Sequence, residues 1–333
     1  MVSQRLRALS TVLSLLLASA LSAFCQSSIT SVRGTVTDPS GAILPGAKVE
    51  LKNAANGQVS SQTANEQGEY HFSQVIPGLY LITVSSVGFG TETKKAELLV
   101  NQPATVNFSL SVQASTETVD VSAQTQTLND ADATIGNALN NATIAALPSE
   151  GRNVPDLLSV QPGVLYLGRG SDKQSDSRTG SVAGARSDQT NVTLDGLDDN
   201  DQTQGYAFTG VLRSTLDSVE EFRVTTTNSN ADAGRSSGGQ VSMVTKSGTN
   251  QFHGAVYEYN RNTFTVANDW FNKAAEESQG LPNVPGKLIR NTFGGSFGGP
   301  IVKNRLFFFG NYEGQRTAEN KQVTRTVPTA SLQ

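Results

Sequence analysis

RNTFGGSFGGPIVKNRLFFFGNYEG, residues 290–314, contains two alternating segments separated by a charged turn at residues 303–305. Phe293 and Phe297 share one face of the first segment. We expect Pro300 to end its hydrogen-bond ladder, because proline has no N–H to donate. A strand that crosses a bilayer needs about 9–11 residues with one apolar face. The pattern predicts a membrane-spanning β-hairpin, with a hairpin of a soluble sandwich as the alternative.

The aromatic residues of the chain concentrate around this hairpin. Residues 252–312 hold 12 of the 22 Phe, Tyr and Trp residues. In the strand predicted around residues 255–260, Tyr257 and Tyr259 alternate with polar neighbours. Since aromatic side chains gather near membrane interfaces, we expect these tyrosines to face lipid and the polar side chains to face a lumen.

Composition excludes several classes of protein. The chain has 333 residues, which is room for about two domains. Charged residues make up 16%, against about 25% in an average soluble domain. The net charge of −4, with no basic block, argues against a nucleic-acid partner. The 31 glycines favour β-structure with many turns.

Residues 1–25 have the pattern of a secretory signal peptide. Arg5 and Arg7 precede an apolar run over residues 9–21, and small residues precede a cleavage position after Cys25. Lipidation of Cys25 is an alternative that the bulky Phe24 disfavours. No later apolar stretch suits a transmembrane helix, so we expect any membrane span to be built from strands.

Residues 29–112 predict a seven-stranded β-sandwich. Turn signals such as Pro45-Gly46, Asn56-Gly57 and Pro77-Gly78 recur every 8–12 residues between short alternating strands. The expected core residues are Tyr70, Phe72, Leu79, Leu81, Val84, Val106 and Phe108.

Two further segments lie between the sandwich and the hairpin. Residues 113–128 form a Ser/Thr/Gln/Val linker, in which residues 117–121 are either an ordinary short strand or a strand donated to the sheet edge of a partner. Residues 129–248 predict a small α+β unit with thin apolar content. Its expected elements are helices at 133–147 and 153–160 and strands at 191–194, 219–226 and 240–245.

The sandwich resembles the carboxypeptidase regulatory-like domain, a transthyretin-like fold. The resemblance rests on GTVTDPSGAILPGAKVEL and NEQGEYHFSQVIPGLYLITVSSVGF. That family accompanies zinc carboxypeptidases but carries no catalytic residue itself. The chain agrees, because a zinc peptidase needs several His and Glu ligands and only His71 and His253 are present.

The whole chain resembles the Oar-like branch of TonB-dependent outer-membrane receptors. The resemblance rests on LPSEGRNVPDLLSVQPGV (147–164), GARSDQTNVTLDGLDDND (184–201), the run from VEEFRV to YNRN (219–262) and the hairpin of residues 290–314. It implies a signal peptide, a periplasmic sandwich, a plug at 129–248 and the start of an outer-membrane barrel at 249–333. It also implies TonB as the periplasmic partner and an unidentified extracellular ligand. A barrel around a plug needs about 22 strands and residues 249–333 hold about four, so we expect this chain to be a fragment.

The resemblance assigns roles to two sets of residues. The TonB-binding strand would be Glu117, Thr118, Val119, Asp120 and Val121. The gating or plug-fixing residues would be Arg152, Arg186, Asp195, Gly196, Glu221 and Arg235. For the second set, the plainer interpretation is a network of salt bridges and hydrogen bonds between plug and barrel.

The sequence predicts no catalytic, cofactor or metal site. The acidic run at residues 195–201 lacks the spacing of an EF-hand, since Gln204 and Gly210 occupy the sixth and twelfth positions counted from Asp199. Asp195-Gly196 is instead expected to form a turn. Nucleophile-elbow and phosphate-loop patterns are missing from the sequence. Two alternatives to a receptor are a carbohydrate-binding surface protein that uses the sandwich, and a secreted zinc peptidase.

Overall fold

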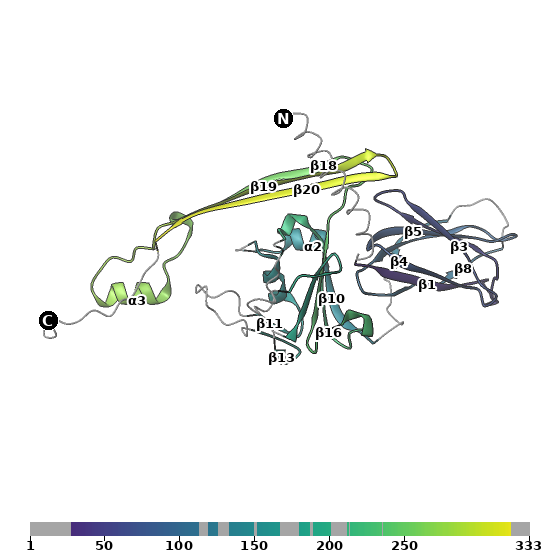
Figure 1. Ribbon diagram of the computed structural model, residues 1–333, viewed down its shortest axis with the longest axis horizontal. Helices are drawn as coiled ribbons and strands as arrows, with labels where there is room; N and C mark the ends of the chain where they lie inside the picture. Colours follow the sequence, from purple (N-terminus) through teal and green to yellow (C-terminus); the bar gives the residue numbers. More distant parts are fainter. Residues whose placement is uncertain are drawn as a thin grey trace, which may run out of the picture.

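The computed structural model of the protein describes residues 28–112, 119–125, 133–149, 152–166, 180–186, 189–200, 212, 214–234 and 236–320. The fold is mainly β, as the sequence predicts. Figure 1 shows three units, which we call the sandwich (residues 28–112 with 119–125), the middle unit (the described residues of 133–250) and the C-terminal sheet (residues 253–319). The expected signal peptide lies outside the described residues.

The sandwich consists of two facing sheets. One has the order β4-β1-β7 with β8 also pairing β1, and the other has the order β3-β2-β5-β6-β9. The strands are β1 (Thr30–Thr37), β2 (Lys48–Asn53), β3 (Val59–Thr63), β4 (Glu69–Val75), β5 (Gly78–Ser85), β6 (Glu92–Leu98), β7 (Ala104–Thr105), β8 (Phe108–Ser109) and β9 (Val119–Thr125). The seven predicted strands are present, the last of them split into β7 and β8.

The core of the sandwich lies between these sheets and contains Tyr70, Phe72, Val84, Val106 and Phe108 as predicted. The prediction was wrong for Leu79 and Leu81, which are only half buried. In β5 the buried residues are Tyr80, Ile82 and Val84, since side chains two residues apart share a face.

The middle unit is built on a five-stranded sheet of order β10-β16-β17-β14-β15 and a three-stranded sheet of order β11-β12-β13. Its elements are β10 (Ile135–Asn140), α2 (Asn141–Ala146), η1 (Val154–Val160), β11 (Val164–Tyr166), β12 (Gly180–Val182), β13 (Ala185–Arg186), β14 (Asn191–Leu194), β15 (Leu197–Asp198), η3 (Leu216–Ser218), β16 (Val219–Thr227), η4 (Ala231–Ala233) and β17 (Gln240–Thr245).

Most elements of the middle unit agree with the sequence. The helix predicted at 153–160 is present as η1, and the three predicted strands are β14, β16 and β17. The helix predicted at 133–147 is wrong over its first half. Residues 135–140 form β10, which pairs antiparallel with β16, and only the six residues of α2 are helical. Pairing with a sheet edge overrides the weak helical pattern of this short segment.

The C-terminal sheet contains three long antiparallel strands, β18 (His253–Asn262), β19 (Leu288–Val302) and β20 (Leu306–Glu319). The prediction that Pro300 ends the ladder is wrong, because β19 continues to Val302 and Pro300 lies opposite Phe307 of β20. Pairing with β18 ends earlier, at Gly298. Pro300 therefore needs no donor on that side of β19, which is where proline is tolerated in a sheet.

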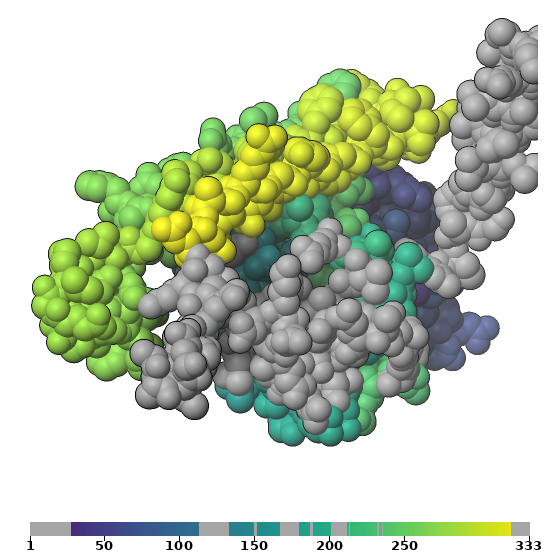
Figure 2. All heavy atoms as spheres, turned by 60° about the vertical axis from the view of Figure 1, so that its left-hand side comes forward, coloured from purple at the N-terminus to yellow at the C-terminus, as the bar shows by residue number. Residues whose placement is uncertain are grey.

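The two ends of the C-terminal sheet differ in their connections. A three-residue turn, Lys303-Asn304-Arg305, joins β19 to β20. At the other end, residues 263–287 join β18 to β19 and contain η5 (Thr263–Thr265) and α3 (Trp270–Ser278). The sheet extends along the middle unit and reaches the sandwich with its turn end (Figures 1 and 2). Among the residues that the structure describes, no helix has the length and apolar character that a bilayer crossing requires.

Candidate functional site: the junctions between the three units

Arg152 connects the middle unit to the C-terminal sheet. It lies in the tight connection between α2 and η1 with a φ of 51°, and its N–H donates to Ser149 Oγ at 3.0 Å. This backbone directs the guanidinium group at two carboxylates. It forms an ion pair with Asp217 of the middle unit and a second one, Nε to Oε2 at 3.2 Å, with Glu313 of β20. One mostly buried arginine thus bridges two units that lie far apart in the sequence.

Two tyrosines of β18 enclose the same guanidinium group. Its central carbon lies 4.9 Å from the ring centre of Tyr257 and 4.3 Å from that of Tyr259. The Tyr257 hydroxyl donates to Glu313 at 2.9 Å. It reaches across β19 at Gly294, where an added Cβ would lie 2.5 Å from the hydroxyl oxygen. A glycine is needed at this position for β18 and β20 to share the contact.

The predicted orientation of Tyr257 and Tyr259 is therefore wrong. Both face the middle unit, because a cation over an aromatic ring and a carboxylate acceptor stabilise them there. The opposite face of the C-terminal sheet carries exposed apolar side chains, among them Val256, Phe297 and Tyr312. Phe297 faces this side as the sequence predicts.

The charges around Arg152 favour its cationic form. Burial by itself lowers the pKa of the guanidinium group, but the carboxylates of Asp217 and Glu313 outweigh burial and raise the pKa above its ordinary value. A buried ion pair is weak evidence for net stability, whereas removal of one partner leaves a buried charge uncompensated. Arg152 is thus suited to hold the two units in a defined position.

The second junction joins the sandwich to a polar face of the middle unit. Along β14, β16 and β17, one face of the sheet is apolar and packs into the core of the middle unit. The other face is polar and yet buried, and it consists of Asn191, Glu221, Arg223, Thr225, Gln240 and Ser242. The sandwich covers part of this face with the β6–β7 loop.

Specific hydrogen bonds connect this loop to the polar face. The Val100 N–H donates to both carboxylate oxygens of Glu221, at 3.0 and 3.1 Å. Asn101 donates to Ser242 Oγ at 2.9 Å, and Arg223 donates to the side chain of Gln102. Burial raises the pKa of Glu221 to about 7, although the hydrogen bond from Val100 and the charge of Arg223 act in the opposite direction.

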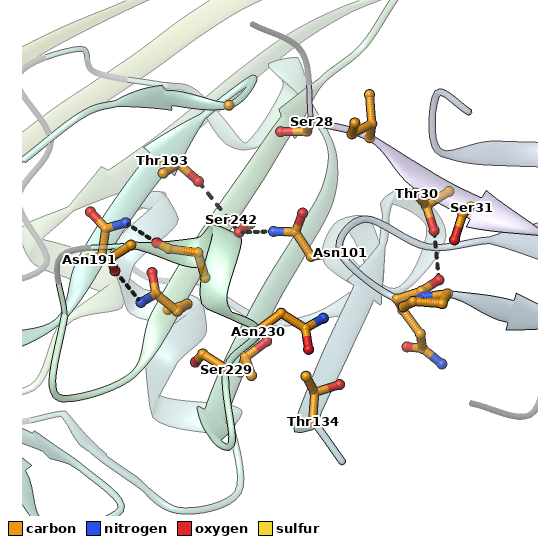
Figure 3. Close-up of a pocket in the computed structure, with 18 of the residues that line it drawn as sticks. Ser28, Thr30, Ser31, Asn101, Thr134, Asn191, Thr193, Ser229, Asn230 and Ser242 are labelled. Atoms are coloured by element: carbon orange, nitrogen blue, oxygen red, sulfur yellow. Dashed lines mark hydrogen bonds between the residues drawn. The ribbon is translucent and has the colours of Figure 1, made fainter. Parts of the chain in front are cut away.

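Beside this contact lies a cavity of about 600 Å³ between the sandwich and the middle unit. Its walls are mainly hydroxyl and amide side chains, including Thr30 and Asn101 from the sandwich and Asn191, Thr193 and Ser242 from the middle unit (Figure 3). Hydroxyl and amide walls of this kind can form hydrogen bonds with water or with a polar ligand.

The third junction joins the sandwich to the turn end of the C-terminal sheet. Asn250 donates its backbone N–H to the carbonyl of Ala55 at 3.1 Å and its side-chain N–H to the carbonyl of Asn56 at 2.6 Å. The Asn250 side chain also donates to Asn304 Oδ1 at 2.7 Å, and the Asn304 backbone N–H donates to Asn250 Oδ1 at 2.8 Å. We call this set the asparagine contact; it holds the β2–β3 hairpin against the turn of residues 303–305.

The predicted TonB-binding segment is only partly described. Glu117 and Thr118 lie outside the described residues, and Val119, Asp120 and Val121 begin β9. β9 pairs parallel with β6 at the edge of the sandwich, with an irregularity between its Val121 and Gln124 positions. The described part of the segment, residues 119–121, is thus a strand added to a sheet edge, here the edge of its own chain.

The remaining predicted residues lie apart from one another. Asp195 and Gly196 form the predicted turn between β14 and β15, with φ values of 51° and 82°, and Asp195 accepts from Thr245 N–H at 2.8 Å. Arg186 lies exposed in β13, and Arg235 is outside the described residues. Among the described residues of the predicted set, Arg152 and Glu221 make polar contacts between units, and Gly196 lines the cavity beside the second junction.

Sequence reasoning missed the partners of these two residues. Asp217 and Glu313 each lie within or next to a quoted motif, but only the folded chain brings them to Arg152. The partner of Glu221 is a backbone N–H, which has no signature in sequence. In the described parts of the chain, no group of three or more His, Cys, Asp or Glu side chains gathers as a metal site.

Comparisons with known proteins match the sandwich and the C-terminal sheet to known domain families. Residues 31–111 match the carboxypeptidase regulatory-like domain family, and residues 244–333 match an outer membrane β-barrel domain family. The TonB-dependent transporter Oar of Myxococcus xanthus is 26% identical in an alignment of 324 positions that covers 92% of this chain and 28% of that protein. The chain thus spans less than a third of the length of this relative.

Two solved structures illustrate the more distant likenesses. The siderophore receptor PirA of Acinetobacter baumannii is 22% identical, with 54% of this chain and 24% of that chain covered and a TM-score of 0.39. Catechol 1,2-dioxygenase of Acinetobacter radioresistens is 16% identical, with 29% and 57% covered and a TM-score of 0.24. Both TM-scores are too low for either likeness to bear on function.

The barrel-domain match supports an outer-membrane location for the C-terminal sheet. The sequence match over most of the chain and the two domain matches make this chain a homologue of the TonB-dependent transporter Oar, with a carboxypeptidase regulatory-like sandwich followed by strands of an outer membrane β-barrel domain.

Proposed function

We propose that this chain works as part of a TonB-dependent outer-membrane receptor, in which the middle unit is the plug and the C-terminal sheet is part of the surrounding barrel wall. The single observation that carries the proposal is the Arg152 junction, where one arginine holds a carboxylate of the middle unit and a carboxylate of β20. A buried charge shared between two units fixes a plug against a wall and releases it when either carboxylate is displaced.

The connections of the C-terminal sheet support an orientation. Outer-membrane barrels have short turns on the periplasmic side and longer loops on the extracellular side. By this rule the turn of residues 303–305 is periplasmic and the connection of residues 263–287 is extracellular. The asparagine contact holds the sandwich against the short turn, so we assign the sandwich to the periplasm. The exposed apolar face with Val256, Phe297 and Tyr312 then faces lipid.

For energy coupling we assign Glu117–Val121 as the strand that TonB captures. Capture by strand addition depends mainly on backbone hydrogen bonds and therefore needs a segment with β-propensity. Val119, Asp120 and Val121 already take part in such an addition, as the first residues of β9 on the edge of β6. Residues 1–25 as signal peptide, 113–128 as linker, 129–248 as plug and 249–333 as barrel complete the proposed organisation.

The plug assignment is tested by Arg152→Ala in the full-length receptor in bacterial outer membranes. Loss of the guanidinium group leaves the half-buried carboxylates of Asp217 and Glu313 without a cationic partner, and Glu313 keeps only its bond from the Tyr257 hydroxyl, so the attachment of plug to wall is weakened. We expect passive entry of a large antibiotic such as vancomycin to rise, with or without TonB. Arg316→Ala, at an exposed arginine of the same strand β20, serves as the control. Equal antibiotic entry in the two variants would show that Arg152 does not hold a plug.

The coupling assignment is tested by Val119→Pro and its matched control Val119→Ala. Proline removes a backbone donor from the strand, whereas alanine keeps it. We expect Val119→Pro to lose capture by the periplasmic domain of TonB while the receptor still assembles in the membrane. Capture at the wild-type level in Val119→Pro would refute the assignment of this segment.

A further inference from the structure

A second cavity lies between the middle unit and the C-terminal sheet, with a volume of about 880 Å³. Four cationic side chains line it: Arg152 and Lys246 from the middle unit, and Arg261 and Arg290 from the C-terminal sheet. Asp217 is the acidic residue among the described lining residues, and it already pairs with Arg152. Cationic side chains thus outnumber acidic ones in the described lining, although Arg152 is already paired with Asp217 and with Glu313 of β20.

The register of β18 and β19 brings two of these cationic side chains next to each other. Arg261 of β18 and Arg290 of β19 lie directly opposite each other in the antiparallel pairing. Residues opposite each other in such a pair point to the same face of the sheet, and like charges in this position are destabilising. Both side chains reach the cavity. A pair of arginines placed in this way is stabilised by an anion between them.

The guanidinium group of Arg290 also has an N–H donor without a hydrogen-bond partner. Its Nε is buried and has no hydrogen-bond partner among the described residues. An unsatisfied buried N–H is costly, and a guanidinium group presents its donors in a planar fork that matches carboxylate and phosphate oxygens. The hydroxyl of the buried Thr292 lies on the same wall and adds a neutral donor.

We propose that this cavity binds a small polyanion that carries carboxylate or phosphate groups, held by Arg261 and Arg290 with Lys246 facing them. This inference rests on the proposed receptor function and names the chemical class of its ligand. Arg261 and Arg290 lie near the end of the sheet that is joined by residues 263–287, which is the extracellular end in the proposed orientation. The site is therefore on the side from which a ligand reaches the plug.

The position of the cavity also gives the anion access to the plug attachment. Arg152 lines the same cavity while it holds Asp217 and Glu313. An anion bound there competes with these carboxylates for the guanidinium group. Ligand binding and release of the middle unit from β20 are thus coupled through one side chain, because differential contacts in the two states are what shifts an equilibrium.

The test is calorimetric binding of citrate and of pyrophosphate to the purified full-length receptor, with maltose as a neutral probe. We expect both anions to bind more tightly than maltose, and their affinity to fall as ionic strength rises. Arg290→Gln should weaken anion binding about tenfold or more, and Arg290→Lys less, because lysine keeps the charge but loses the fork. Arg305→Gln, at the opposite end of the sheet, is the matched control and should bind like the wild type.

Three outcomes overturn the proposal: no binding of either anion, equal binding of anions and maltose, or unchanged anion affinity in Arg290→Gln. Binding of only one of the two anions decides between carboxylate and phosphate ligands and supports the site. Capture by TonB gives the independent readout. If Val119→Pro keeps capture by TonB while Arg290→Gln loses anion binding, the coupling assignment fails and the anion site stands. If Val119→Pro loses capture while Arg290→Gln binds anions like the wild type, the anion site fails and the coupling assignment stands.

Discussion

Glu221 should make the docking of the sandwich onto the middle unit depend on pH. Its carboxylate accepts two bonds from the Val100 N–H while only 4% of the residue is exposed. Burial raises its pKa from 4.5 to about 7, and the charged groups that face it are Arg223, Glu97 and Glu220. The docked state therefore favours the protonated carboxyl group more than the undocked state does, in which Glu221 regains contact with water.

The direction and size of the effect follow from proton linkage. Between pH 4.5 and about 7 the docked state binds more protons, so docking is strongest below pH 4.5, weakens as pH rises through this window and is constant above it. A pKa change from 4.5 to about 7 corresponds to about 3 kcal/mol, or about 300-fold in the docking equilibrium, if Glu221 becomes fully hydrated on undocking. Glu221→Gln should remove this dependence, because an amide accepts from Val100 without titrating.

Hydrogen exchange of the Val100 amide in the full-length receptor measures this equilibrium. The amide is bonded to Glu221, so it exchanges when the junction opens. After correction for the intrinsic pH dependence of exchange, wild-type protection should fall between pH 5 and 7, and protection in Glu221→Gln should stay level. The same pH slope in both proteins, or wild-type protection that grows with pH, would contradict the role assigned to Glu221.

Three further changes test other parts of the structure. Tyr70→Phe leaves the backbone carbonyl of Val106, between β7 and β8, without its 2.6 Å donor, and should lower the stability of the sandwich by about 1–3 kcal/mol, as measured by the temperature dependence of its proteolysis. Lys95→Cys with Gln124→Cys joins positions that are paired between β6 and β9; in a background without Cys25, oxidation should reduce TonB capture and a reductant should restore it. Gly57→Ala places a Cβ 2.8 Å from Asn304 Oδ1 at a φ of 74°, and should speed exchange of the amides in the asparagine contact without changing sandwich folding.

The sequence was most informative where local patterns set the structure. The turn dipeptides of the sandwich and the alternation around Phe293 and Phe297 predicted strands that are present. Predictions failed where a distant partner decides the outcome. Residues 135–140 become a strand because β16 offers an edge, and Tyr257 turns inward because Arg152 lies there. Neither partner is visible in a local window of sequence.

The candidate site shows the same division. Arg152 and Glu221 stand out in sequence as charges within motifs, but their functions follow from contacts with Asp217, Glu313 and Val100. The cationic cavity was not predicted at all. The cavity depends on the strand register that sets Arg261 opposite Arg290. That register depends in turn on the connection between β18 and β19, whose sequence has no clear periodic pattern.

The hydrophilic side of the β14-β16-β17 sheet affects what happens when the sandwich and the middle unit separate. Amide, hydroxyl and charged groups on that side can all be satisfied by water once the sandwich leaves. Undocking of the sandwich therefore exposes a hydrophilic face of the middle unit and not its hydrophobic core. The sandwich is in this respect an accessory that can be gained, lost or exchanged without redesigning the middle unit.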